Sequence, residues 1–566
     1  MRAFFHNVLI VCVLAGGALD AIPARGQTGE PPLPVLAPAT ETDVAIARRL
    51  SKGGPLALDG QRLRNLDALR RFYAERGFDP VWTDQTGQAA AAPGLVALVR
   101  LADLEGLEPR HYHPDAIERR LGAADVGGQA ELDLLITDAI MEYTGDLRTG
   151  RLPPRTLAPE MAATPPKLDA IEIVKNAMAA PDLPAFLKGF TPPHPQYAAL
   201  RDALKRYRVV TSAGGWPVVG EGAVLKPGMR DAGVPALRRR LAATGEYSVK
   251  DNGKDLSSTL YDAPLEVAVK QFQSQTGLGP DGVVGVSTRL ALNIPAAGRV
   301  DQIIANMERW RWMEDDLGER HVMVNIPGYT LKAVTPGAAP LRMPVIVGTT
   351  ERATPVFSHR ITHLVFNPTW TIPPTVARND ILPKLLRDPG YLKDHDITLF
   401  DSWAAGARTL DARRIDWRSV GSRITRYRMR QDPGPKNSLG RIKFMFPNEF
   451  DVYLHDTPAR DKFSRTARGL SSGCVRVGDP AALADYLMAG MEDWPVERRQ
   501  LVLDGGETKT VWLRQSVPVH LTYQTVFVDE AGKVQFREDI YDRDAAFTAA
   551  LAKRLPVQQT VAQAAE

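Results

Sequence analysis

Cysteine is almost absent from this 566-residue chain, which contains only Cys12 and Cys474. Cys12 lies inside an N-terminal apolar segment, so removal of that segment would leave Cys474 as the only thiol. A single thiol excludes an internal disulfide. In an oxidising compartment an unpaired cysteine is either a small buried hydrophobe or a reactive group, and its neighbours decide between the two.

A strong excess of one charge is also absent, because 70 lysines and arginines nearly balance 66 aspartates and glutamates. The net charge is only +4, and the chain contains no long basic block. This argues against nucleic acid as the main partner, since binding it needs concentrated positive charge. The chain is too long for a single hydrophobic core, and its ordinary composition predicts several folded domains.

The N-terminal apolar run is short for a membrane-spanning helix. Arg2 precedes the run Val8 to Ala15, and small residues around Ala24 resemble a cleavage site. We therefore predict that residues 1–26 are an export signal and that the protein is periplasmic. Extension of the run through residues 18–22 leaves an uncleaved inner-membrane anchor as the alternative, and only in that case is the membrane a partner.

The first half of the chain has helical periodicity after a proline-rich linker at residues 27–45. Leu63, Leu66, Leu69 and Phe72 are one example of apolar residues at helical spacing. We predict a helical scaffold over residues 46–222, to which residues 300–319 return.

Residues 225–293 are predicted to form a compact three-helix unit. Gly245 and Gly277 end its first two helices, and Asp281-Gly282 marks a turn before a third. The run Ala268-Val-Lys-Gln-Phe272, with the glycines that follow, resembles the peptidoglycan-binding domain 1 family. A generic three-helix spacer is the alternative.

The periodicity changes to two at about residue 320, as in the run His321-Val-Met-Val-Asn-Ile326. Residues 320–545 are therefore predicted to be mainly β. A charged stretch at about 380–430, which contains Trp403 and Trp417, is long enough to be a capping insertion. Residues 546–566 are predicted to be a C-terminal tail, and the fold class is multidomain α+β.

The neighbours of Cys474 favour a reactive thiol. Gly473 removes a side chain where a substrate backbone must approach, and the valines after Cys474 favour a strand. Arg476 lies two residues further and shares the face of Cys474 on such a strand. Backbone N–H groups at Ser472, Gly473 and Cys474 are candidates for holding an oxyanion.

The thiol needs a base, because the thiolate is the nucleophile. His455, 19 residues upstream, is at the end of the predicted strand Asp451 to His455. Tyr453 lies two residues earlier and should share its face. A histidine with a purely structural role is the alternative, but the nearby Gly-Cys pair favours a catalytic one.

The pattern His455-Asp-Thr…Ser471-Ser-Gly-Cys-Val-Arg-Val477 resembles the signature of L,D-transpeptidases of the YkuD fold. The layout resembles the long Gram-negative, YcbB-like branch, which has a scaffold, a peptidoglycan-binding domain and a capped catalytic domain. Many family members have histidine immediately before Gly-Cys, whereas this chain has Ser472. His455 is therefore the only local candidate base.

The resemblance implies a peptidoglycan transpeptidase that forms 3→3 cross-links through a thioester between Cys474 and a tetrapeptide stem. It implies that Arg476, Tyr453, Trp370 and Asn437 contact the substrate and that carbapenems acylate the thiol. The implied partners are the stem peptides and the glycan of peptidoglycan. Other cell-wall synthases are a second class of partner that the resemblance suggests.

Three alternatives stay open at this point. Water or a lipoprotein lysine could be the acceptor in place of a stem amine, and the protein could be a non-catalytic scaffold that binds the wall. No cofactor or metal is expected. His359 and His363 have the spacing of a zinc motif, but they lie in a strand-like run where they are too far apart to chelate one ion.

Overall fold

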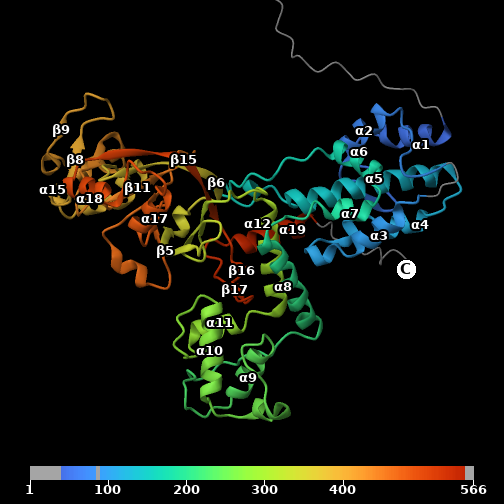
Figure 1. The fold of residues 1–566 in the computed structure, drawn as a ribbon, viewed down its shortest axis with the longest axis horizontal. Helices are drawn as coiled ribbons and strands as arrows, with labels where there is room; N and C mark the ends of the chain where they lie inside the picture. The colour runs from blue at the N-terminus through green and yellow to red at the C-terminus, as the bar shows by residue number, and fades with distance from the viewer. Residues whose placement is uncertain (1–39, 85–88, 555–566) are drawn as a thin grey trace, which may run out of the picture.

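The computed structural model describes residues 40–84 and 89–554. The predicted signal and most of the predicted linker lie outside these residues. Figure 1 shows a helical scaffold on the right, a three-helix unit at the bottom and a β-rich body on the left. The predicted fold class is therefore confirmed. Within the described ranges, no helix combines the length and apolarity needed to cross a membrane.

The scaffold is built around helix α5 (Val126–Thr149), most of whose residues are buried. Such a helix must be surrounded by others. The other scaffold helices are α1 (Glu41–Leu50), α2 (Leu66–Glu75), α3 (Ala92–Arg100), α4 (Pro114–Arg120), α6 (Ala170–Ala179) and α7 (Leu183–Lys188). Helix α1 begins earlier than the predicted scaffold boundary at residue 46, because Thr40 and Asp43 form a capping box.

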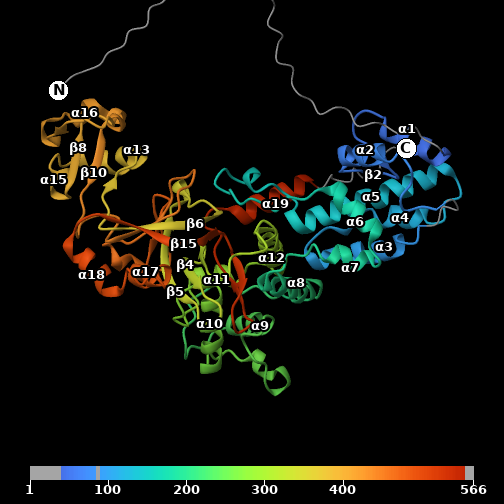
Figure 2. The same ribbon diagram turned by 45° about the horizontal axis from the view of Figure 1, so that its top comes forward.

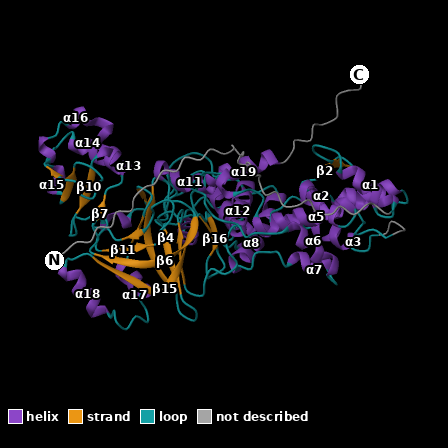
Figure 3. Ribbon diagram, turned by 90° about the horizontal axis from the view of Figure 1, so that it is seen from above, coloured by secondary structure: helices purple, strands orange, loops and turns teal. Residues whose placement is uncertain are grey.

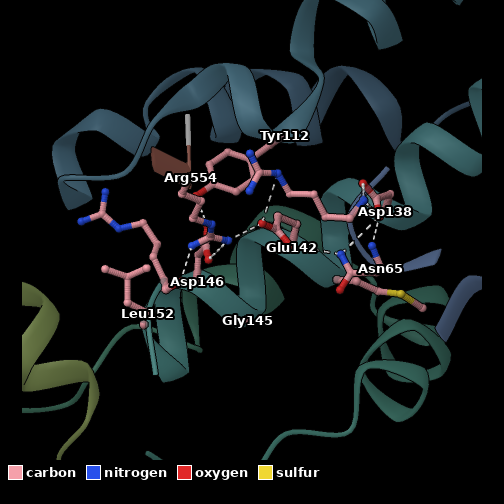
Figure 4. Close-up of polar contacts among 12 residues, drawn as sticks. Asn65, Tyr112, Asp138, Glu142, Gly145, Asp146, Leu152 and Arg554 are labelled. Carbon is pink, nitrogen blue, oxygen red and sulfur yellow. Dashed lines mark hydrogen bonds and ion pairs between the residues drawn. The ribbon is translucent and has the colours of Figure 1, made fainter. Parts of the chain in front are cut away.

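Buried carboxylates on α5 fix the loops that cross it. Asp133 accepts hydrogen bonds from the backbone N–H groups of Val81, Trp82 and Thr83 at 2.7–3.0 Å. Asp138 accepts from the backbone of Asn65 at 2.9 Å, as Figure 4 shows. These bonds satisfy backbone donors that burial would otherwise leave unpaired.

Helices α8 (Pro195–Ser212) and α12 (Ala296–Arg311) connect the three bodies and share one apolar core. α12 carries the fully buried Glu308, which forms an ion pair with Arg311 at 2.7 Å and with Arg151 at 3.2 Å. The two guanidinium groups compensate the cost of burying the carboxylate. The predicted return of residues 300–319 to the scaffold corresponds to this helix.

The three-helix unit lies below α8 and α12 in Figure 1 and has its own core, which includes Leu237, Leu265 and Phe272. Its helices are α9 (Val234–Ala242), α10 (Ala263–Gln275) and α11 (Val286–Leu292). The Gln273 amide donates to Asp281 at 2.8 Å, and this bond holds the turn after α10.

The β-rich body contains one nine-stranded sheet that closes on itself. Its order is β13-β5-β14-β12-β11-β6-β15-β3-β4, and β4 also pairs with β5. The strands are β3 (His321–Asn325), β4 (Thr330–Val334), β5 (Leu341–Gly348), β6 (Phe357–Phe366), β11 (Ile442–Met445), β12 (Leu454–His455), β13 (Gly469–Ser471), β14 (Val475–Val477) and β15 (Lys509–Thr522).

The two faces of this sheet differ. Leu364, Phe444, Leu454, Val475 and Val511 alternate inward and are buried in the main core of the body. Helix α17 (Pro480–Leu487) packs into the same core, and α18 (Val496–Gly505) follows it. The residues between the buried ones point outward on these five strands, so the outer face can carry polar chemistry.

A capping subdomain interrupts the sheet between β6 and β11, and Figure 2 shows it as a separate lobe at the upper left. It contains β7 (Trp370–Thr371), β8 (Ile397–Phe400), β9 (Thr409–Leu410) and β10 (Arg428–Gln431), with α13 (Pro374–Val376), α14 (Leu382–Leu385), α15 (Tyr391–Asp394) and α16 (Trp417–Val420). Its own core includes Trp417 and Ile372. The cap therefore begins about ten residues earlier than predicted.

The C-terminal tail predicted for residues 546–566 differs from the structure. Hairpin β16–β17 (Val526–Val528 and Val534–Phe536) follows the sheet, and helix α19 (Arg543–Arg554) then runs beside α12 to the scaffold. Residues 546–554 are helical because Phe547 is buried and Arg554 forms ion pairs with Glu142 and Asp146 on α5. Figure 3 shows that the scaffold is almost entirely helical, whereas most strands lie in the catalytic body and the cap, where α17, α18 and the cap helices accompany them.

A scaffold segment enters the core of the β-rich body. Ala158, Met161 and Ala162 belong to the same apolar cluster as the sheet. Backbone bonds join Ala162 N to Val356 O at 2.9 Å and Val356 N to Glu160 O at 2.8 Å. The scaffold and the sheet are therefore joined by backbone pairing as well as by side chains.

Candidate active site

Cys474 lies immediately before β14, in a tight bend that requires glycine. Gly473 has φ of 114°, which favours glycine over residues with a side chain. The Ser471 hydroxyl donates to the Cys474 carbonyl at 2.5 Å and accepts from the Gly473 N–H at 3.2 Å. The Gly473 N–H is thus already bonded, which differs from its predicted role in an oxyanion hole. Among the described residues, no bond to the Cys474 N–H is seen.

The register of the sheet brings the predicted residues together. β12 pairs in parallel with β14 so that His455 lies opposite Arg476, and Tyr453 consequently lies beside Cys474. All four side chains point to the outer face, as their two-residue spacing predicts. His455 and Cys474 are diagonal neighbours, roughly 7–8 Å apart between Cα atoms.

The imidazole of His455 is buried and oriented by its neighbour. Its Nδ1 lies 2.5 Å from the Asp456 carbonyl, which places a proton on Nδ1 and leaves Nε2 to accept another. Burial lowers the pKa of His455 to about 3, with help from the positive charges of Arg476 and Lys443. The ring is therefore neutral at physiological pH, as a base must be.

The Cys474 thiol is half-buried, and its polar partners are a backbone carbonyl and a tyrosine rather than a histidine: its sulfur donates to the Asp451 carbonyl at 3.9 Å and interacts with Tyr453. Burial raises the pKa of Cys474, while hydrogen bonds from Tyr453 and the charges of Lys443 and Arg476 oppose the rise. The Tyr453 hydroxyl also contacts Trp370. Within the described residues, no hydrogen bond joins the thiol to His455.

The sequence prediction missed Lys443. On β11 it lies directly opposite His455 in the register, so His455 is between Lys443 on one side and Arg476 on the other. The Lys443 ammonium is 3.8 Å from the centre of the Tyr453 ring. Burial lowers the pKa of Lys443, opposed by the charges of Cys474 and Asp451.

Arg476 is half-buried beside this row, and its Nε is buried without a hydrogen-bond partner among the described residues. A buried guanidinium nitrogen without a partner is costly unless a ligand or water binds it. A contact with the substrate, which the family resemblance implies for Arg476, would supply such a partner.

These side chains form part of the floor of a cavity of about 1030 Å³ between the sheet and the cap. Trp370 lines it from the cap, as predicted for a substrate contact. Asn437 differs from its prediction: it is buried, and its amide donates to the carbonyls of Pro368 and Asp432 at 2.9 and 3.0 Å. Asn437 therefore holds the base of the cap and does not line the cavity.

Arg352 links the cap to the nucleophile loop. It forms an ion pair with Asp380 of the cap at 2.5 Å and donates to the Ser472 hydroxyl at 2.8 Å. Arg352 therefore holds the side chain of Ser472, which is two residues before Cys474 in the chain.

Three family models match the chain in the predicted order. A scaffold domain matches residues 67–204, and a peptidoglycan binding domain matches residues 230–292. The YkuD model, described as an L,D-transpeptidase catalytic domain, matches residues 319–497 and includes both Cys474 and His455. Residues 319–497 are a YkuD-type L,D-transpeptidase catalytic domain.

Individual relatives of the chain carry matching names. A Haemophilus influenzae protein assigned as an L,D-transpeptidase is 37% identical over 245 residues, which are 43% of this chain and 48% of that protein. The chain thus spans about half of that relative. The Mycobacterium tuberculosis N-acetylmuramoyl-L-alanine amidase CwlM is 38% identical over 76 residues, or 13% of this chain and 19% of CwlM.

A solved L,D-transpeptidase from Xylanimonas cellulosilytica is 16% identical to the chain. The match covers 54% of this chain and 99% of the solved chain. Its TM-score is 0.18, which does not establish a shared overall fold. The YkuD domain is therefore identified by its family model and its motif.

Proposed function

We propose that this protein is a peptidoglycan L,D-transpeptidase that forms 3→3 cross-links through a thioester at Cys474. The observation that carries the proposal is the juxtaposition of one thiol and one neutral imidazole on the floor of a capped cavity. A peptidoglycan-binding domain in the same chain supports the choice of substrate.

Acylation begins when His455 Nε2 accepts the proton of the Cys474 thiol. Substrate binding must first close the diagonal gap between the two side chains, since hydrogen bonds between catalytic groups often tighten only in the substrate complex. The thiolate attacks the carbonyl of stem residue three, and the Cys474 N–H is available to hold the oxyanion. The C–N bond then breaks, and the imidazolium returns its proton to the departing D-Ala amine.

Deacylation reverses these roles. The side-chain amine of a second stem attacks the thioester, His455 takes a proton from that amine, and the proton returns to the sulfur as the thiol leaves. Lys443 and Arg476 stabilise negative charge on the sulfur and can bind a substrate carboxylate. A diaminopimelate stem supplies both the amine and the carboxylate.

The acceptor determines which product the acyl-enzyme gives. Water in place of the amine would give a carboxypeptidase, and a protein lysine would give lipoprotein attachment. A non-catalytic scaffold that binds the wall is disfavoured by the intact Cys474 and His455 pair. The substrate lies outside the cytoplasm, so we also propose that residues 1–26 export the protein to the periplasm.

The decisive experiment incubates the purified protein with disaccharide-tetrapeptide and identifies the products by mass spectrometry. We expect release of D-Ala and a dimer joined between two third residues. Cys474→Ala should abolish both, and His455→Gln should lower the rate by at least about 100-fold. Tripeptide without dimer would establish hydrolysis instead, and dimer formation by Cys474→Ala would overturn the mechanism.

Carbapenems offer an independent test, because they present a strained carbonyl to the same thiolate. Intact mass should increase by one drug molecule for the wild type and remain unchanged for Cys474→Ala. The absence of an adduct with the wild type, where a related enzyme is acylated, would count against a reactive Cys474.

A further inference from the structure

Trp512 on β15 is an exposed aromatic residue in the middle of the catalytic sheet. Its side chain is 64% exposed. The ring centre lies 4.3 Å from that of His363 on β6, with 36° between the planes. The Thr362 hydroxyl lies 2.9 Å from His363 Nδ1 and orients the imidazole. The two rings form a supported aromatic surface that neither the core nor the cap covers.

This aromatic pair lies on the same face of the sheet as the nucleophile. Trp512 pairs with His363, and His363 pairs with Met445 on β11. β11 and β12 pair from Lys443 with His455 to Phe444 with Leu454, and continuing this register by one residue places Met445 opposite Tyr453. Tyr453 in turn lies beside Cys474. One row of side chains therefore runs across the outer face from Trp512 to Cys474.

The cavity extends along the neighbouring row. Its lining includes Val365 on β6 and Thr508 just before β15, as well as Lys443 and His455. Val365 is two residues from His363 and so points to the same face. The aromatic pair consequently lies at the rim of the reaction cavity.

We propose that Trp512 and His363 form a subsite for the sugar that carries the acyl-donor stem. The inference deepens the proposed function and rests on it. Four strand spacings separate β15 from β14, which is about 19 Å along the sheet. Three extended stem residues span about 10–11 Å, and the ether link and the sugar ring extend this reach further.

The chemistry of the pair fits a sugar better than more peptide. A flat indole packs against the C–H groups of a pyranose ring, while the nearby imidazole can exchange hydrogen bonds with its hydroxyl groups. The aromatic pair is about 19 Å from Cys474, which is farther than three stem residues can reach, so the part of the substrate that lies there is the sugar. The donor is the expected occupant because its third carbonyl is fixed at the sulfur.

The test compares two donors whose third residue carries an acetylated side-chain amine, so that neither can act as an acceptor: disaccharide-tetrapeptide and the same tetrapeptide without sugar. The initial rate of D-Ala release then measures acylation alone, and dimer formation is measured separately with the unmodified disaccharide-tetrapeptide. For Trp512→Ala we expect KM to rise about tenfold with the disaccharide donor and to remain within twofold with the bare tetrapeptide. Trp512→Phe should retain most of the affinity, and His363→Ala should lie between the two.

Leu501→Ala is the matched control, because Leu501 is 74% exposed on α18 and lies outside the cavity lining. Equal losses with both donors, or no loss with either, would overturn the subsite. Normal acylation with slower dimer formation would assign the sugar to the acceptor and overturn the donor assignment. If the wild type released D-Ala from neither donor, the proposed function itself would fail.

Discussion

His455 lies between two cations in one row of the sheet, with Lys443 on one side and Arg476 on the other. Neither cation is paired with a carboxylate at hydrogen-bond distance among the described residues. An opposite charge within about 4–6 Å can lower a thiol pKa by about 1–3 units, whereas burial raises it. These two effects compete at Cys474: burial raises the pKa of the thiol, and the two cations make the rise smaller.

Lys443→Gln tests this electrostatic role. Loss of the ammonium should raise the pKa of Cys474, so the pH profile of its alkylation by iodoacetamide should move to higher pH. Lys509→Gln is the control. Lys509 is an exposed lysine on β15 that pairs with Phe366, so it lies on the face of the sheet opposite to that of Trp512 and Cys474. If the two profiles coincide, Lys443 acts on the substrate instead of the thiol.

The pH profile of the wild type has a second informative feature. Burial holds the pKa of His455 at about 3 and raises that of Cys474, so the free enzyme contains a neutral pair. Alkylation should therefore increase with pH only in the alkaline range, without an inflection between pH 5 and 7. An inflection near pH 6 that disappears in His455→Gln would reveal a thiolate–imidazolium pair instead.

The sequence predicts some site residues better than others for a physical reason. Cys474 and Arg476 are on one short strand, where two-residue spacing determines the shared face. Lys443 enters the site only through long-range pairing of β11 with β12, which the sequence does not reveal. Asn437 has the right chemistry for a groove, but local loop geometry turns its amide inward.

The cap is an element whose attachment to the body matters for the site. Asp380 and Arg352 form one of its contacts with the catalytic body, and the same arginine holds Ser472. Both side chains are about one-third exposed, so solvent weakens the pair to about 0–1 kcal/mol. Such a contact can open without unfolding the domain.

Asp380→Asn should loosen the cap with little effect on global stability. We expect the melting temperature to fall by no more than about 2 °C. Amide hydrogen exchange of residues 374–385 should increase in the same variant. Asp411→Asn, which breaks a pair with Arg413 inside the cap, should leave that exchange unchanged. Unaltered exchange in Asp380→Asn would show that other contacts hold the cap.

At the scale of elements, the sequence predicts the change from helical to strand periodicity and the presence of a cap. It places the start of the cap too late, because β7 is two residues long and pairs only with β10 at the other end of the insertion. The helical nature of residues 546–554 was also missed, since α19 is stabilised by contacts with α5 about 400 residues earlier.

Helix α19 connects the catalytic body to the scaffold, and its last residue, Arg554, belongs to the polar cluster shown in Figure 4. Arg554 bonds to Glu142 at 2.5 Å and to Asp146 at 2.8 Å. Burial and the nearby Asp146 raise the pKa of Glu142 to about 7. A raised carboxyl pKa stabilises the fold below the ordinary value of 4.5, and this stabilisation is lost as pH rises through about 7.

Arg554→Gln should therefore destabilise the protein in a pH-dependent manner. Without the guanidinium, two buried carboxylates face each other, and the loss should reach about 3 kcal/mol at pH 8 and be smaller at pH 5. Thermal melts at the two pH values measure the difference. Lys553→Gln removes an exposed charge one residue earlier and should change neither melt. A loss of equal size at both pH values would exclude Glu142 as the responsible group.

The entry of residues 158–162 into the sheet core has a consequence for how this architecture can be divided or inherited. A gene fragment that starts at the YkuD boundary would encode a body without Met161 and without the backbone partner of Val356. We therefore expect that an exchange of catalytic domains between such proteins needs to include this distant strip, because its loss would uncover part of the sheet core. The catalytic body and its scaffold are in this sense a single heritable unit.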